Sequence, residues 1–126
     1  MTLEISNNTT TLLIIDDEGS VRRALSRILF KYADKIVTAS NMTDAQLILD
    51  TDMVTHILCD QLLGPGQPTG IESAIFWKKR YPGIKKLFIL TGTKVASVPA
   101  PDGIDKVLPK TTDPLQLAAM LELKSL

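Results

Sequence analysis

The sequence predicts an α/β fold in which a doubly wound parallel sheet of five strands is covered by helices on both faces. Short runs of apolar and β-branched residues alternate with longer segments whose apolar residues recur at helical spacing. Parallel strands need a crossover about as long as a helix, so strict alternation of the two patterns indicates a parallel sheet. The predicted strands are 11–15, 35–39, 54–60, 86–90 and 104–108.

Composition favours one globular domain and excludes several classes of function. The chain has 126 residues, 44% of them hydrophobic, and its 14 basic residues balance 14 acidic ones. Without a basic excess, direct nucleic-acid binding is not expected. The single cysteine, Cys59, excludes an internal disulfide and a multi-cysteine metal site. No apolar run has transmembrane length and no signal peptide is evident, so we expect no membrane partner and a cytoplasmic location.

Apolar spacing also predicts helices and the domain limits. Residues 1–10 are polar and β-branched, which suits a flexible N-terminal leader, and residues 11–126 form the predicted domain. The expected core-facing helix residues are Val21, Leu25, Ile28, Leu29 and Tyr32; Met42, Ala45, Leu47 and Ile48; Ile71, Ala74, Ile75 and Trp77; and Leu115, Leu117, Ala118, Leu121 and Leu123. Pro99 and Pro101 interrupt the fourth crossover, so its helix is expected to be short or missing.

Polar residues stand where each of four predicted strands ends. Asp16 and Asp17 follow the first strand, Asp60 ends the third, and Thr91 and Lys110 follow the fourth and fifth. A single acid there commonly caps a turn or a helix. Because the carboxyl ends of parallel strands meet at one edge, where open α/β sheets bind ligands, five such residues together indicate a site.

The residue types at this edge suit phosphoryl transfer with a hard cation. Neighbouring carboxylates repel one another unless a cation enters, and all-oxygen ligands are typical of Mg²⁺. Lys110 adds a positive charge and Thr91 a hydroxyl donor. His56 and Cys59 lie within a strand and are expected to be buried structural residues, so zinc is not expected. The loop 61–70 is rich in Gly and Pro but lacks the Gly-Lys-Ser/Thr ending of a phosphate-binding P-loop.

These motifs together resemble the receiver domain of two-component response regulators. The resemblance runs from about residue 11 to the C-terminus. It is carried by apolar strands that end in Asp16-Asp17-Glu18, in Asp60, in Thr91-Gly92 and in Pro109-Lys110. The motifs occur in the family's order and at approximately its separations. One strand followed by two aspartates is weak evidence, whereas all of the positions in register are specific.

The resemblance implies a role for each of these residues. Asp60 is the implied acceptor of a phosphoryl group from a sensor histidine kinase or a histidine phosphotransfer protein. The implied Mg²⁺ ligands are Asp16, Asp17, Asp60 and the backbone carbonyl of Leu62. Asp17 would bind the ion directly and Asp16 largely through water. Thr91 and Lys110 would contact phosphoryl oxygens, and small Gly92 would leave room for them.

The resemblance also implies a topology and a mode of action. The strand order would be 2-1-3-4-5, as in flavodoxin-like receiver folds, with the site at the switch point between the first and third strands. The domain would act as a phosphorelay switch on a downstream protein target or output domain. At most it would catalyse its own phosphorylation and dephosphorylation, rather than turn over a conventional substrate.

Four departures from the family pattern concern the output surface. The loop 61–70 is somewhat longer than usual, and Thr111 follows Lys110 where the family usually has proline. The fourth helix is hard to find. Val107 occupies the place of the family's aromatic switch residue. Activation is therefore expected to be transmitted through 61–70 and 93–103, rather than by the usual coupling.

Three rival classes are compared with this interpretation. A pseudo-receiver, which only binds partners, would not need every acid, Thr91 and Lys110. A haloacid-dehalogenase-type phosphatase would have Asp-x-Asp after the first strand, where this chain has Asp16-Asp17-Glu18. A flavodoxin-like flavin binder would have a hydroxyl- and glycine-rich phosphate loop there.

Overall fold

The computed structural model describes residues 9–92 and 103–123 and has the predicted parallel sheet. The strands are β1 (Thr11–Ile15), β2 (Lys35–Ala39), β3 (His56–Asp60), β4 (Lys86–Thr91) and β5 (Lys106–Pro109). They lie in the order β2-β1-β3-β4-β5. The helices are α1 (Gly19–Leu29), the 3-10 turn Phe30–Tyr32, α2 (Met42–Thr51), α3 (Gly70–Arg80) and α4 (Pro114–Met120). None of these described helices is long and apolar enough to cross a membrane.

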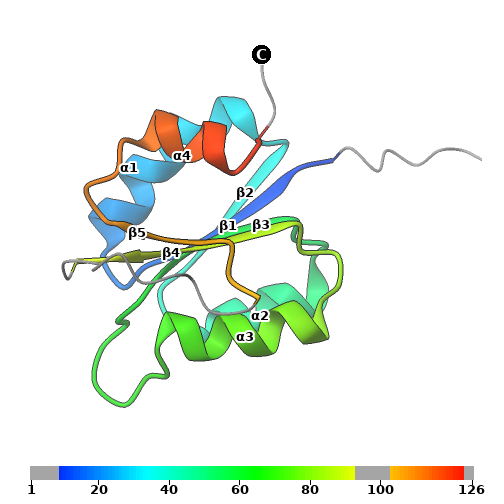
Figure 1. The fold of residues 1–126 in the computed structure, drawn as a ribbon, viewed down its shortest axis with the longest axis vertical. Helices are drawn as coiled ribbons and strands as arrows, with labels where there is room; N and C mark the ends of the chain where they lie inside the picture. The colour runs from blue at the N-terminus through cyan, green and yellow to red at the C-terminus, as the bar shows by residue number, and fades with distance from the viewer. Residues whose placement is uncertain (1–8, 93–102, 124–126) are drawn as a thin grey trace, which may run out of the picture.

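The sheet separates two hydrophobic cores, with α1 and α4 on one face and α2 and α3 on the other (Figure 1). Alternate residues of a strand point to opposite faces. In β1, Leu12 and Ile14 accordingly pack with α1 and α4, whereas Leu13 and Ile15 pack with α2 and α3. Every residue of β1 and β3 is buried, which confirms the inference from their uninterrupted apolar runs.

The helices bury fewer residues than their apolar spacing predicts. Ile28, Leu47 and Leu115 are 40%, 60% and 54% exposed, and Ile75 is 36% exposed, so their assignment to the core was wrong. Short helices on a sheet bury a narrow stripe. In α2, the stripe is Met42, Ala45 and Leu49, three and four residues apart, and it turns Leu47 toward solvent.

Two strands also begin later than predicted. Val54 and Thr55 are buried but precede β3. The Thr55 hydroxyl donates to the Thr11 carbonyl at 3.1 Å and accepts from the Thr11 N–H at 2.9 Å. The predicted fifth strand began at residue 104, whereas β5 begins at Lys106. Residues 1–8 of the predicted leader and 93–102 of the interrupted crossover lie outside the described residues.

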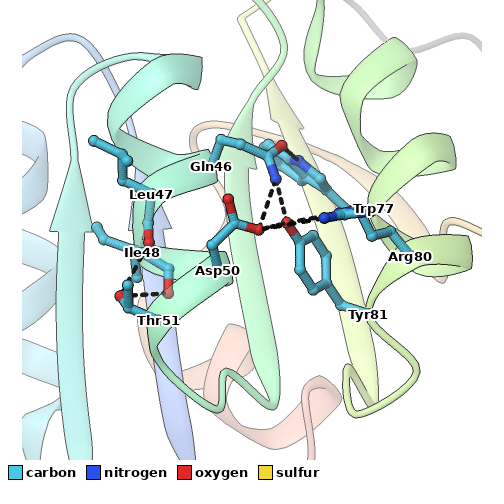
Figure 2. Close-up of polar contacts among 8 residues, drawn as sticks. All are labelled: Gln46, Leu47, Ile48, Asp50, Thr51, Trp77, Arg80 and Tyr81. Carbon is cyan, nitrogen blue, oxygen red and sulfur yellow. Dashed lines mark hydrogen bonds and ion pairs between the residues drawn. The ribbon is translucent and has the colours of Figure 1, made fainter.

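A polar network fixes α2 against α3 at the surface (Figure 2). The Gln46 side chain accepts from the Trp77 indole N–H at 3.1 Å and donates to the Tyr81 hydroxyl. That hydroxyl donates to Asp50, and the Arg80 guanidinium lies over the Tyr81 ring. Because the buried side of this network is the large ring of Trp77, the two helices are held in one relative position beneath the sheet.

Candidate functional site at the carboxyl edge of the sheet

The ends of four strands bring the predicted site residues to one edge. Asp16 follows β1, Asp60 is the last residue of β3, Thr91 is the last of β4, and Lys110 follows β5. In the sheet, β2 lies on one side of β1 and β3 lies on the other. The carboxyl edge between β1 and β3 is therefore the switch point, where the direction of strand addition reverses. Asp16, Asp60 and Thr91 are all buried.

Lys110 connects the carboxylates of the site. Its Nζ lies 3.1 Å from Asp16 Oδ2, 3.3 Å from Asp60 Oδ2 and 3.6 Å from Glu18 Oε1. Its backbone N–H donates to the carbonyl of Thr91 at 2.9 Å, which continues the β4–β5 pairing by one residue. Burial by itself lowers the pKa of Lys110, but hydrogen bonds and charges from Asp16 and Asp60 outweigh that and raise it. Lys110 therefore stays protonated in the site.

The backbone around Asp16 is held on three sides. Its N–H donates to the carbonyl of Ala39 at 3.1 Å, and its own carbonyl accepts from the Arg22 guanidinium at 2.7 Å. Its carboxylate Oδ1 accepts from the backbone N–H of Glu18 at 2.9 Å. These bonds leave Oδ2 directed at Lys110, so the carboxylate has one fixed orientation.

Asp60 is buried in a way that disfavours its charged form. Burial raises the pKa of Asp60, the negative charge of Asp16 raises it further, and Lys110 opposes both. The remaining oxygen, Oδ1, lies 3.5 Å from the backbone nitrogen of Leu62, at the limit of a hydrogen bond. One carboxylate oxygen is thus paired with a cation and the other is weakly engaged.

The loop after Asp60 is closed at its base by Gln61. The Gln61 N–H donates to the Leu90 carbonyl at 2.9 Å, its carbonyl accepts from Gly70 at 2.9 Å, and its side chain accepts from Ile71 at 3.0 Å. A Cβ on Gly70 would stand 2.7 Å from the backbone oxygen of Asp60, so a side chain there would displace the end of β3. The loop leaves and returns at the site.

The acids after β1 form a cluster that suits a hard cation. Within the described part of the chain, Asp16, Asp17 and Glu18 place carboxylate oxygens within 4.8 Å of one another. Asp17 and Glu18 are exposed, so this side is open to ions from solvent. An all-carboxylate donor set fits Mg²⁺.

The structure groups the predicted ligands only in part. Asp16 and Asp17 lie together, but Asp60 is joined to Asp16 through Lys110, and Leu62 is a loop residue that is 61% exposed. Glu18 was not among the predicted site residues. It stands at the start of α1, and the structure brings its carboxylate to Lys110. Its place beside two aspartates was the signal for a role in the site.

Comparison with proteins of known sequence finds transcriptional regulators. No protein-family model matches the chain. It is 34% identical over 85 residues to the hydrogenase transcriptional regulatory protein HoxA of Cupriavidus necator and 39% identical over 51 residues to HoxA of Bradyrhizobium diazoefficiens. These matches cover 68% and 40% of the chain, but only 17% and 10% of the two regulators.

Solved structures give the class of fold. A Burkholderia pseudomallei response regulator with a phosphorylated aspartic acid and a calcium ion aligns over 89% of this chain and 66% of its own, with a TM-score of 0.76 and 24% identity. The response regulator TrrA of Thermotoga maritima, in complex with Mg²⁺ and beryllofluoride, aligns over 90% and 97%, with a TM-score of 0.76 and 23% identity. The chain thus has the receiver fold of response regulators, and the resemblance predicted from its sequence is confirmed.

Proposed function

We propose that the chain is a receiver domain that accepts a phosphoryl group on Asp60. The observation that carries this proposal is the pairing of a buried carboxylate at the switch point with a single lysine that also holds Asp16. Asp60 thus combines a nucleophilic oxygen with a cation already beside it. The domain spans residues 11–126, after a leader of residues 1–10.

The proposed reaction is transfer from a phosphohistidine. A carboxylate oxygen of Asp60 attacks the phosphorus, the P–N bond breaks, and its electron pair returns to the imidazole, which takes up a proton as it leaves. Lys110 pairs with a phosphoryl oxygen, and the Thr91 hydroxyl donates to another. Hydrolysis reverses the state, because water attacks the phosphorus and releases phosphate and the Asp60 carboxylate. Beyond this self-modification, no turnover of a conventional substrate is proposed.

Mg²⁺ is the proposed cofactor, held by Asp16, Asp17, Asp60 and the backbone carbonyl of Leu62. The carboxylate cluster of Asp16, Asp17 and Glu18 supports this assignment, since it offers only hard oxygen ligands. A divalent ion there would supply positive charge that neutralises phosphoryl oxygens. Glu18 is available as a further ligand, directly or through water.

The proposed partners follow from the chemistry of the site. A sensor histidine kinase or a histidine phosphotransfer protein would supply the phosphoryl group in the cytoplasm, as a step of a phosphorelay. A downstream protein or output domain would read the change. Transcriptional control is one such output, since the HoxA relatives are transcriptional regulators by name and are several times longer than the matched segment.

The test is intact mass after incubation with acetyl phosphate and Mg²⁺. Wild-type protein should gain one phosphoryl group, Asp60→Asn should gain none, and EDTA should prevent the gain. Asp52→Asn, at a surface aspartate paired with Lys35, is the matched control and should label normally. Equal labelling of Asp60→Asn would overturn the assignment. A wild-type protein that never labels would favour the pseudo-receiver, a module that binds partners without phosphorylation.

A further inference from the structure

Three arginines line one groove beside the first turns of α1. The groove has a volume of about 350 Å³ and is lined by Gly19, Arg22, Arg23, Ser26, Arg27 and Thr38. Arg23 and Arg27 are exposed and Arg22 is half-buried. Within residues 9–92 and 103–123, none of the three arginines forms an ion pair. The groove therefore carries positive charge that no ion pair of the described residues neutralises.

Gly19 lets two of the guanidinium groups converge. A Cβ at this position would stand 3.0 Å from Arg23 Nη1 and 3.4 Å from Arg22 Nη2, so both groups lie over the first turn of α1. Like charges brought together, and like charges four residues apart on a helix as at Arg23 and Arg27, are unfavourable. An anion in the groove would remove that repulsion and accept paired hydrogen bonds from the guanidinium groups.

The surroundings of the groove favour a protein over a nucleic acid. The whole chain carries no net charge, so it lacks the extended basic field typical of nucleic-acid binding. Phe30 follows Arg27 by three residues, on the same side of the helix, and is 62% exposed. Arginine and aromatic residues together are characteristic of protein interfaces.

We propose that the groove of α1 and β2 is a docking site for an acidic protein segment that also carries an apolar side chain. Carboxylates of the segment would pair with Arg23 and Arg27, and its apolar side chain would cover Phe30. Arg22 donates to the carbonyl of Asp16 at 2.7 Å, so a docked segment lies next to the phosphoryl site without occupying it. This binding goes beyond the proposed phosphoryl transfer and does not require it.

The probe is an amphipathic peptide of glutamate and leucine, titrated into ¹⁵N-labelled protein. Amide shifts should concentrate in residues 19–30 and at Thr38, and the affinity should fall steeply as salt shortens the range of charge interactions. Arg23→Glu combined with Arg27→Glu should weaken binding at least about tenfold. A peptide with glutamine in place of glutamate should bind as weakly as the charge-reversed variant does.

The control variant combines Lys79→Glu with Lys106→Glu, which changes the net charge equally at two exposed lysines away from the groove. It should bind the peptide like wild type. Equal weakening of both variants, or shifts spread over all basic residues, would overturn the proposal. So would tighter binding of a short DNA duplex than of the peptide. Both variants should still label with acetyl phosphate, so failure of docking is distinguished from failure of the phosphoacceptor assignment.

Discussion

The two buried titratable residues of β3, Asp60 and His56, differ in their surroundings. Asp60 is buried next to a second acid and a lysine, at the edge of the sheet where solvent and ligands arrive. His56 is buried at the opposite end of the same strand, hydrogen-bonded through Nδ1 to the Thr55 hydroxyl at 2.8 Å. Burial disfavours charge on both, but one site is open to a cation and the other is packed. Only the first is suited to chemistry.

His56 gives a pH dependence with a definite sign. Burial lowers the pKa of His56, and the charge of Lys85 lowers it further. Below the ordinary histidine pKa of about 6.5, His56 is therefore protonated in the unfolded chain but not in the folded one. The free energy of unfolding is highest above that pH and falls below it, by at most about 1.4 kcal/mol per pH unit. Urea unfolding at about pH 7.5 and pH 5.5 should show this loss. His56→Gln should remove it.

The pH dependence of wild-type protein and of His56→Gln is best compared with Asp60→Asn present in both proteins. Asp60 has a raised pKa, so its contribution has the opposite sign and decreases stability as pH rises. His56 is the only histidine in the chain, so ring titration by NMR reports directly on it. An ordinary histidine pKa in the folded protein would contradict the prediction.

At the scale of elements, the connection between β3 and α3, from Gln61 to Thr69, is longer than a short strand-to-helix turn. It is fixed to β4 and α3 by Gln61, and it ends in a capping box in which Thr69 and Glu72 bond each other's backbone N–H groups. The backbone N–H and the hydroxyl of Thr69 both donate to the Glu72 carboxylate and lower the pKa of Glu72. The loop is therefore a defined connection with both ends anchored.

Gly70→Ala should destabilise the protein and impair the site. The new Cβ would stand 2.7 Å from the backbone oxygen of Asp60 and 3.2 Å from Ile89, so either β3 or α3 must shift, at a cost of about 1–3 kcal/mol. Gly83→Ala is the control, since its Cβ would meet only the flexible Met53 side chain at 3.4 Å. Its effect should stay within about 0.5 kcal/mol. Equal urea midpoints for the two variants would refute the close approach at Gly70.

The sequence predicted elements better than it predicted contacts. The parallel sheet and the meeting of Asp16, Asp60 and Lys110 at one edge follow from the alternation of strands and helices along the chain, whereas the strand order was implied only by the resemblance to receiver domains. The exposure of Leu47 and the network of Gln46, Asp50 and Tyr81 depend on how α2 rotates against α3. That rotation is decided by packing between distant residues. Glu18 was not predicted for the site because its partner, Lys110, is distant in sequence.

At the scale of the whole molecule, the acids after β1 should couple metal binding to global stability. If Mg²⁺ binds the folded chain alone, it should raise the free energy of unfolding by about 2.7 kcal/mol at a hundredfold excess over Kd. Asp17→Asn should lose most of this gain. Because Asp17 is exposed, this substitution should change the stability of the metal-free protein little. Thermal melts with Mg²⁺ or EDTA provide the measurement, and an undiminished Mg²⁺ effect in Asp17→Asn would exclude it as a ligand.

The segments that contact Asp60 and the loop after it decide how phosphorylation would change the structure of a distant surface. In the receiver family, an aromatic ring near the fifth strand moves with the threonine of the site. Here that place holds Val107, whose compact side chain packs against the core on the α2 and α3 side. The loop instead offers a continuous connection, because Gln67 accepts a hydrogen bond from the first N–H of α2, at Met42, at 3.2 Å. A change at Asp60 that moves the loop must act on α2.

Beryllofluoride with Mg²⁺, which mimics the phosphorylated state, should therefore shift amide signals across Gln61 to Gly70 and at the start of α2, with small shifts in 114–120. A shift of populations requires an element whose two arrangements differ in affinity for the added group, and the loop is anchored at the site for that role. Gln67→Ala should keep the loop shifts and remove those at Met42 and Asp44. Shifts concentrated in α4 would show instead that Val107 transmits the signal without a ring. The segment 93–102 lies outside the described residues, and its shifts would test the second predicted route.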